Sequence, residues 1–448
     1  MPVIAPFKAL RYGAPLASQM SKLVAPPYDA ISPGEQEALH AAHPNNVVRL
    51  ILAKDGAHAD RYATAAQTLG SWLEKGVLVE DDTPALYVYA QRYTLPTGEE
   101  LSREGCIAAV KLEPFAPPSP GTDLGHGVKA HERTLEPPLE DRLKVMMATQ
   151  ANLSQPFALY QDAEREIDTR LARHRGEPVL RFRTADGVTH ALWRVLDAGA
   201  IAFVAGRLRD AALVIVDGQH RYEAALRYRD AMRQKHPNAG PDASFEYLPM
   251  FLCNAADPGL TVLPTHRLLA PGTELNPDKL IEGLSKHFFI TQRLTPPATS
   301  HGARLLAREL KAAGERGPCF AVTVPKMPTT LMCILKPGLD LSELPGLPAA
   351  DSLRMLDVTV LHALCLEALL AQPAGRLEYE HDASVALDRV MSARNPAGFF
   401  LPATRIEQIF AAAKASERMP PKSTLFYPHL ASGLILRRLD ASTRVTPV

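Results

Sequence analysis

The segment Asp217-Gly218-Gln219-His220-Arg221 combines residue types that can hold a phosphate group. The first N–H groups of a helix lack internal partners and attract anions, so this segment would be well placed at a helix start. Gly218 would let the backbone approach a ligand closely, and His220 and Arg221 would donate charged hydrogen bonds. Asp217 would hold a magnesium ion. The structural alternative is an ordinary Asp-Gly turn whose aspartate caps the helix.

A second group of candidates contains a carboxylate beside a histidine. Glu132 follows His131 in Lys129-Ala130-His131-Glu132-Arg133-Thr134, and such a pair can act as a general base or bind a metal. We expect Glu132 to be the catalytic base, with His131 assisting. Asp29, which the rigid turn Ala25-Pro26-Pro27-Tyr28-Asp29 would aim at a ligand, is the second candidate. Solvated surface charge and a capped turn are the structural alternatives.

Two further segments carry weaker signals. Leu263-Pro264-Thr265-His266-Arg267 places a basic pair after an apolar run, although a structural histidine with satisfied hydrogen bonds is the commoner case. Pro421-Lys422-Ser423-Thr424 resembles the end of a P-loop, but the preceding glycines are missing, so it is no Walker site. The chain also lacks G-x-G-x-x-G, H-E-x-x-H and G-x-S-x-G, which removes support for the common nucleotide and hydrolase folds.

The elements around these residues can be predicted from hydrophobic spacing. An apolar run at 211–216 and helical spacing at 219–235 predict a strand, a tight turn and a helix around Asp217 and Gly218. Helices are also predicted at 57–77 and 139–153, the latter preceded by a mobile loop at 114–128. Runs rich in Val, Tyr and Ile predict two hairpins, formed by 85–94 with 103–112 and by 179–183 with 189–195.

The second half of the chain alternates both kinds of element, so we expect an α/β fold of mixed α+β type. Breaking residues cluster at 236–244, which predicts a first domain at 1–238 and a second at 239–448. Helices are predicted at 277–288, 303–314, 358–371 and 404–416, and strands at 320–324, 330–335 and 433–439.

Composition excludes several classes of protein. The 448 residues contain 49 Lys+Arg and 49 Asp+Glu, so there is no net positive field to attract nucleic acid. No apolar run approaches the length of a membrane helix. The five cysteines are scattered and form no C-x-x-C pair, which is typical of free thiols in a reducing cytoplasm. We therefore expect a cytoplasmic protein without nucleic-acid or membrane partners.

The order of these motifs resembles the bacterial and archaeal family called domain of unknown function 1015. The resemblance spans nearly the whole chain and rests on Pro6-Phe7-Lys8-Ala9-Leu10, Ala25-Pro26-Pro27-Tyr28-Asp29, His131-Glu132-Arg133-Thr134, Asp217-Gly218-Gln219-His220-Arg221, Leu263-Pro264-Thr265-His266-Arg267 and Met419-Pro420-Pro421-Lys422-Ser423-Thr424. The family's turn is similar to the nucleotide turns of free-serine kinases, sulfiredoxin and ParB proteins. This resemblance implies a ParB/sulfiredoxin-like N-terminal half and a second α/β half.

The resemblance also implies an activity: a magnesium-dependent kinase that uses ATP or ADP to phosphorylate the hydroxyl of free L-serine or a similar amino acid. Gly218, Gln219, His220 and Arg221 would then bind the nucleotide, with Asp217 at the metal. The chain departs from the family pattern at Gln219, where a histidine is usual, and at His429, where a lysine is more usual. Because an amide carries no charge, a non-catalytic nucleotide-binding regulator or scaffold is the alternative.

Overall fold

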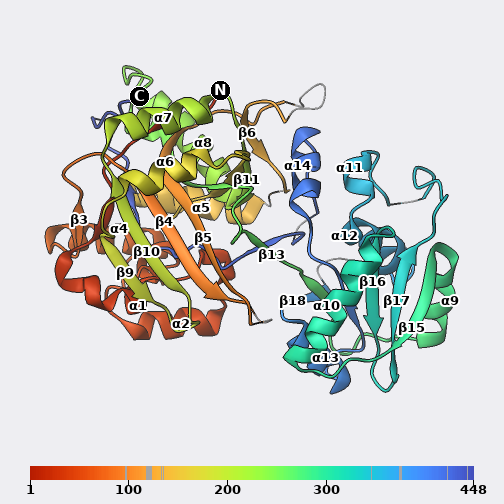
Figure 1. Cartoon of the computed structure of the whole chain (residues 1–448). Helices are drawn as coiled ribbons and strands as arrows, with labels where there is room; N and C mark the ends of the chain where they lie inside the picture. The colour runs from red at the N-terminus through yellow and green to blue at the C-terminus, as the bar shows by residue number, and fades with distance from the viewer. Residues whose placement is uncertain are drawn as a thin grey trace.

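The computed structural model describes residues 1–95, 98–117, 124–132, 134, 136–344, 346–372, 376–420, 422–440 and 442–447. Within these residues the chain forms two lobes, each built around one large sheet (Figure 1). Helices pack beside both sheets, which confirms the mixed α/β prediction.

The sheet of the first lobe has nine strands among the described residues, in the order β6-β11-β8-β12-β5-β4-β10-β9, with β1 paired to β5. Strand β6 is parallel to β11 and β12 is parallel to β8, whereas the other pairs are antiparallel. The strands are β1 Ile4–Ala5, β4 Leu86–Thr94, β5 Glu100–Lys111, β6 Gly127–Ala130, β8 Phe157–Tyr160, β9 Leu180–Arg183, β10 Thr189–Val195, β11 Ala212–Asp217 and β12 Tyr247–Asn254.

Helices of the first lobe lie before and between these strands. They are α1 Met20–Leu23, α2 Pro33–Ala42, α3 Val48–Ile51, α4 Arg61–Glu74, α5 Glu136–Thr149, α6 Glu166–His174, α7 Ala198–Arg209 and α8 Gln219–Lys235, with the 3-10 turns η1 Ala14–Gln19, η2 Tyr28–Ala30 and η3 Ser244–Glu246. Both predicted hairpins are confirmed, as β4 with β5 and β9 with β10. The predicted strand, turn and helix are confirmed as β11, Gly218 and α8.

The second lobe contains a six-stranded sheet in the order β15-β17-β16-β19-β14-β18. Its strands are β14 His266–Leu269, β15 Phe288–Leu294, β16 Cys319–Thr323, β17 Thr329–Leu335, β18 Leu377–Glu380 and β19 Gly398–Phe400. Its helices are α9 Pro277–His287, α10 Ser300–Gly314, α11 Asp351–Arg354, α12 Asp357–Val360, the π-helix η4 Leu361–Glu367, α13 Ala383–Met391 and α14 Ile406–Lys414.

Short sheets bring distant parts of the chain together. Strand β2 (Leu10–Tyr12) pairs with β3 (Leu78–Glu80), β7 (Ala151–Asn152) pairs with β21 (Arg437–Arg438), and β13 (Thr261–Leu263) pairs with β20 (Leu425–Tyr427). The C-terminal segment therefore returns from the second lobe to the first. The strand predicted at 433–439 is wrong except for Arg437 and Arg438, because most of that segment forms single bridges and turns.

The domain division predicted at residues 238 and 239 stays a prediction. Strand β12 lies beyond that point and belongs to the first sheet, and β21 rejoins the first lobe near the end of the chain. The apolar core covers both faces of the first sheet: Phe157, Phe251 and Tyr89 pack on one face, while alternate residues such as Ala158 and Leu252 pack on the other.

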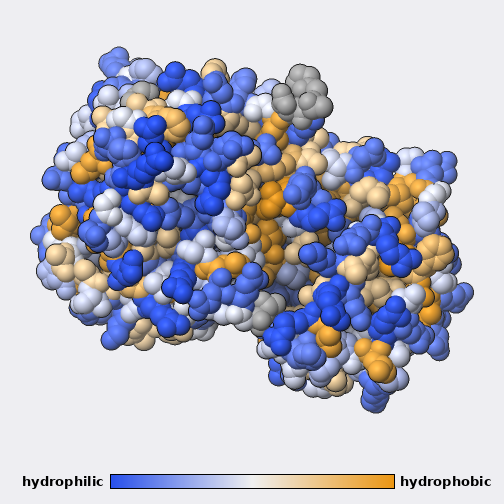
Figure 2. All heavy atoms as spheres, viewed as in Figure 1, coloured by the Kyte–Doolittle hydropathy of each residue, from blue (hydrophilic) through white to orange (hydrophobic). Residues whose placement is uncertain are grey.

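A hollow between the two lobes is lined with hydrophobic side chains (Figure 2). It includes a pocket of about 540 Å³ next to β13 and α10. Apolar residues that line the pocket are Leu95, Leu260, Val262, Leu263, Pro264, Leu306, Leu310, Leu401 and Ile406.

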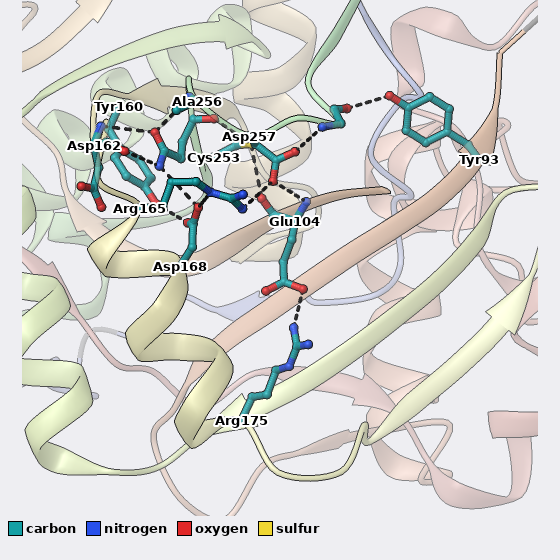
Figure 3. Close-up of polar contacts among 12 residues, drawn as sticks. Tyr93, Glu104, Tyr160, Asp162, Arg165, Asp168, Arg175, Cys253, Ala256 and Asp257 are labelled. Carbon is teal, nitrogen blue, oxygen red and sulfur yellow. Dashed lines mark hydrogen bonds and ion pairs between the residues drawn. The ribbon is translucent and has the colours of Figure 1, made fainter. Parts of the chain in front are cut away.

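The carboxylates of Glu104, Asp168 and Asp257, of which Asp257 is buried, connect β5, α6 and the turn after β12 (Figure 3). Arg165 Nε donates to Asp168 Oδ2 at 2.9 Å, while Asp257 accepts backbone N–H groups of Gly259 at 2.8 Å and Glu104 at 3.3 Å. Burial, supported by the charge of Asp168, raises the pKa of Asp257. Among the described residues no cluster of three or more His, Cys, Asp or Glu side chains could hold a metal ion.

Candidate functional site

The site forms where two neighbouring parallel strands end. Ala130 of β6 pairs with Ile215 of β11, so Glu132, two residues after β6, and Asp217, the last residue of β11, lie at the same edge of the sheet. Ligands of sheets with parallel strands bind outside such carboxyl ends. The structure thus brings together two candidate residues that lie 85 positions apart in the sequence.

The turn after β11 requires glycine for two reasons. Gly218 has a φ of +78°, in the left-handed region that favours glycine, and it is the N-cap of α8 without a side-chain cap. A Cβ at this position would lie 2.6 Å from the guanidinium of Arg221. The space beside Gly218 is therefore filled by Arg221, whereas we expected it to admit a ligand.

Arg221 holds the turn from inside the protein. Its side chain is 6% exposed, and it donates from Nη2 to Asp217 Oδ2 and from Nη1 to the carbonyl oxygen of Gln155, both at 2.7 Å. Its buried Nε–H has no hydrogen-bond partner among the described residues. Burial alone would raise the pKa of Asp217, but Arg221, His429 and hydrogen bonds outweigh it and lower that pKa. Arg221 thus keeps Asp217 ionised, and its predicted contact with phosphate stays a prediction.

Gln219 ties the turn to the loop that carries Glu132. Its Nε2 donates to the carbonyl oxygen of Glu132 at 2.5 Å, and its Oε1 accepts the backbone N–H of Glu132 at 3.3 Å. Nε2 also lies 3.2 Å from Glu223 Oε1. These contacts use both ends of the amide, so Gln219 positions Glu132 relative to the helix start. Its predicted contact with phosphate stays a prediction.

Glu132 has the properties expected of a base near neutral pH. Its side chain is 25% exposed, and Oε1 accepts the backbone N–H of Lys422 at 3.4 Å. Burial raises its pKa to about 7, with further upward effects from Asp217 and Asp29 that Lys422 opposes. A carboxylate with this pKa can accept a proton at neutral pH and release it again.

His131 is buried behind Glu132. Its Nδ1 lies 2.7 Å from the carbonyl oxygen of Ile215 and must donate to it, so in the neutral ring Nε2 accepts from Thr424 Oγ1 at 3.1 Å. Burial lowers the pKa of His131 to about 4. The ring is therefore neutral near pH 7. Its contacts with Ile215 and Thr424 favour a role in fixing the loop, and they do not favour a role in proton transfer.

Asp29, His220 and His429 complete the site. Asp29 is exposed in η2, and its negative charge favours the protonated forms of Glu132, His220 and His429. Burial nevertheless lowers the pKa of both histidines overall. The structure thus places every predicted site residue in one region. Three parts of the predicted motifs and loop lie outside the described residues: Arg133, Pro421 and 118–123.

The sequence interpretation assigned no role to two basic residues of this region. Arg267 is buried, and its Nη2 donates to the carbonyl oxygen of Lys422 at 3.0 Å. Lys422 itself influences Glu132 and His220 through its charge. The signals in the sequence were a basic pair at Arg267, a P-loop-like end at Lys422 and the order of the two motifs, and none of them indicated that the segments meet.

We predict that Glu132→Gln stabilises the protein at alkaline pH. The pKa of Glu132 is raised from 4.5 to about 7 in the folded state, so its contribution to stability is full below 4.5 and is lost as pH rises through 7. Glutamine keeps the shape without ionising. Allowing for partial exposure, we expect a gain of about 1–2 kcal/mol at pH 8.5 that shrinks toward pH 5.

Urea denaturation at pH 5, 7 and 8.5 would measure this gain. Glu140→Gln, which changes an exposed carboxylate on α5, is the control and should give no pH-dependent difference. Equal stabilities of Glu132→Gln and the unmodified protein at pH 8.5 would contradict the prediction.

Residues 4–359 match the family model described as "Protein of unknown function (DUF1015)". The match covers most of the chain, so the chain belongs to this family.

Three solved structures show a low overall similarity. A conserved hypothetical protein from Pyrococcus furiosus is 14% identical with a TM-score of 0.33, and the alignment covers 69% of this chain and 91% of that protein. A variant of a free serine kinase in complex with ADP is 15% identical, with a TM-score of 0.33 and coverages of 70% and 92%. SbnI with a C-terminal truncation, from Staphylococcus aureus, is 8% identical, with a TM-score of 0.33 and coverages of 69% and 83%. No curated protein matches the chain.

Two predictions from composition can be compared with the structure. All five cysteines are buried and free, as predicted. None of the helices in the described ranges combines the length and apolar content that a membrane crossing requires.

Proposed function

We propose that this protein is an ATP- or ADP-dependent kinase that phosphorylates the hydroxyl of free L-serine or a similar amino acid. The observation that carries the proposal is the position of Glu132, a carboxylate with a pKa of about 7, beside the Asp217-Gly218 turn and the start of α8. This arrangement supplies a base and an anion-binding helix start at one sheet edge. The motif resemblance to free-serine kinases suggests the nucleotide and the acceptor.

The phosphates of the nucleotide would bind at the N-terminus of α8. The N-cap Gly218 has no side chain, so no side-chain acceptor caps the first N–H groups of this helix. His220 would add a hydrogen bond, while the Arg221–Asp217 pair keeps the turn in shape.

Glu132 would then act as the general base. Its carboxylate accepts the proton of the substrate hydroxyl while that oxygen forms a bond to the terminal phosphorus. The bond between this phosphorus and the bridging oxygen breaks, and the nucleotide leaves with one phosphate fewer. Asp29, the exposed carboxylate nearby, is suited to bind the amino group of the acceptor.

Mg²⁺ fits this site as an ion carried by the nucleotide. Such an ion usually keeps several waters and needs only one or two carboxylates, so a preformed cluster of protein ligands is not required. Arg221 occupies Oδ2 of Asp217, and Oδ1 would be the ligand. When bound, the ion would neutralise charge on the transferred phosphoryl group.

The second candidate is a nucleotide-binding regulator or scaffold without catalysis. Gln219 favours this non-catalytic candidate. The family usually has a histidine at this position, whereas the amide of Gln219 forms hydrogen bonds with the backbone of Glu132. The two candidates differ in product formation. A kinase is stabilised by nucleotide and forms a phosphorylated amino acid, whereas a regulator is only stabilised.

A thermal-shift series with ATP and ADP, followed by chromatography of reactions with hydroxylated amino acids, distinguishes the candidates. Stabilisation with a phosphorylated product supports the kinase. Stabilisation without product from any acceptor would leave the regulator, and no stabilisation would refute both.

Three finer parts of the interpretation belong to the same proposal. The turn would be of the ParB/sulfiredoxin-like nucleotide-binding type, although Gln219 takes the place of the sulfiredoxin cysteine and excludes its sulfur chemistry at this turn. We also propose a cytoplasmic location, in keeping with the free thiols, and no nucleic-acid partner, in keeping with the balanced charge.

A further inference from the structure

The segment that leaves α14 passes directly over the loop that carries Glu132. The backbone N–H of Met419 donates to the carbonyl oxygen of His131 at 2.7 Å, and Met419 forms a parallel bridge with Glu132. Three residues later, the N–H of Lys422 reaches Glu132 Oε1 at 3.4 Å. The part of the chain that follows α14 (Figure 1) therefore lies against the loop that carries Glu132 and forms one wall of the site.

Side chains of the second lobe hold this segment in place. The buried guanidinium of Arg267 donates to the carbonyl oxygen of Lys422 at 3.0 Å and from Nε to His362 Nε2 at 3.3 Å. Thr404 Oγ1 donates to the carbonyl oxygen of Ser423 at 2.8 Å. These contacts satisfy the consecutive backbone carbonyl groups of Lys422 and Ser423 and fix the course of the segment.

The backbone of Lys422 has an uncommon conformation. Its φ of +61° lies in the left-handed region, which few residues other than glycine adopt. Such conformations persist where the surrounding structure imposes them, and they cluster at functional sites. Here Arg267 and Thr404 supply the contacts that impose it.

Among the residues that the structure describes, the ammonium group of Lys422 forms no ion pair with a carboxylate. The side chain is exposed, and within the described ranges it makes no hydrogen bond or ion pair. The backbone N–H of Lys422 lies 3.4 Å from Glu132 Oε1, and the charge of Lys422 lowers the pKa of both Glu132 and His220, so the residue lies beside the base. An unpaired cation beside an anion-binding helix start is suited to a phosphate group.

We propose that Lys422 binds the terminal phosphate of the nucleotide, and that Arg267 and Thr404 of the second lobe position it. This inference rests on the proposed function and adds to it a role for the second lobe. The ammonium acts as a point charge that neutralises the oxygens of the transferred phosphoryl group. No proton moves to or from Lys422 during the transfer.

Calorimetric titration of the full chain with ATP and with AMP tests the role of Lys422. AMP lacks the terminal phosphate, so Lys422→Gln should weaken ATP binding by about 10-fold or more and leave AMP binding within about twofold. Lys422→Arg should restore most of the ATP affinity because it keeps the charge. Lys326→Gln is the matched control, since Lys326 is an exposed lysine of the second lobe with a φ of +65°, and it should change neither affinity.

The outcomes separate this inference from the proposed function. Unchanged ATP affinity of Lys422→Gln, or an equal loss for ATP and AMP, would overturn the role of Lys422 while the kinase could stand. Nucleotide binding without a phosphorylated product would refute the kinase, and the comparison of ATP with AMP would still decide the role of Lys422. Absence of nucleotide binding by the unmodified protein would overturn both.

Thr404 tests the positioning role. Thr404→Val removes the hydroxyl that donates to Ser423 and keeps the shape of the side chain, so we expect a loss of about threefold in ATP affinity with little effect on AMP. Thr404→Ser, which keeps the hydroxyl, should bind ATP as the unmodified protein does. A loss in Thr404→Val that serine fails to restore, or that is equal for AMP, would contradict positioning through this hydrogen bond.

Discussion

Glu132→Gln is expected to lower the turnover of the kinase by about 10²–10⁴-fold, the usual contribution of a general base. The amide cannot accept the proton of the substrate hydroxyl. It keeps the contact with the N–H of Lys422 because its oxygen still accepts, and the backbone bonds to Gln219 do not involve the changed group. We therefore expect nucleotide affinity to change by less than about threefold.

The pH dependence gives a second readout of the same substitution. Because the pKa of Glu132 is raised to about 7, the rate of the unmodified enzyme should rise with pH through that value as the base ionises. The variant should lose this rise. Steady-state kinetics between pH 5.5 and 9, with Glu140→Gln as the control, would measure both effects. Retention of the full rate by Glu132→Gln would remove Glu132 as the base.

Gly218→Ala is expected to abolish measurable nucleotide binding. A left-handed φ disfavours alanine by about 1 kcal/mol, and the new Cβ would lie 2.6 Å from the Arg221 guanidinium, which must then move. Moving Arg221 breaks its bonds to Asp217 and Gln155 and leaves a partly buried carboxylate without its cation. The turn that presents the start of α8 would change shape as a result.

Gly76→Ala provides the matched control for this substitution. Gly76 has a φ of +65°, but no atom lies within 4 Å of the position that a Cβ would occupy. This variant should lose about 1 kcal/mol of stability and keep nucleotide binding. Calorimetric titration and thermal unfolding of both variants compare the two sites. Equal effects of the two substitutions would show that contact with Arg221 is irrelevant to binding.

The local elements of the site could be predicted from the sequence because their signals are local. The apolar run before Asp217 and the helical spacing after Gly218 identified β11 and α8 within one or two residues. Valine-rich and tyrosine-rich runs identified both hairpins for the same reason. Strand β12 was missed, because Pro249 lies within it and proline argues against a central strand, yet this strand pairs on both sides.

The relationships between segments could not be predicted, since they depend on which strands pair. Glu132 meets Asp217 because β6 lies parallel to β11, and no spacing in the sequence specifies that pairing. The sequence also could not show that Arg221 turns back over Gly218 instead of pointing toward a ligand. The role of Gln219 was hidden as well, because its partner is the backbone of a distant loop.

The central claim is that nucleotide phosphate binds at the Asp217-Gly218 turn beside Glu132. A crystal structure of the chain with bound ADP tests it most directly. We expect a phosphate oxygen within ~3.5 Å of the backbone nitrogen of Gln219 or His220, with Lys422 directed toward the terminal phosphate. ADP bound elsewhere, for example in the apolar pocket beside β13 and α10, with this turn free of phosphate, would contradict the claim.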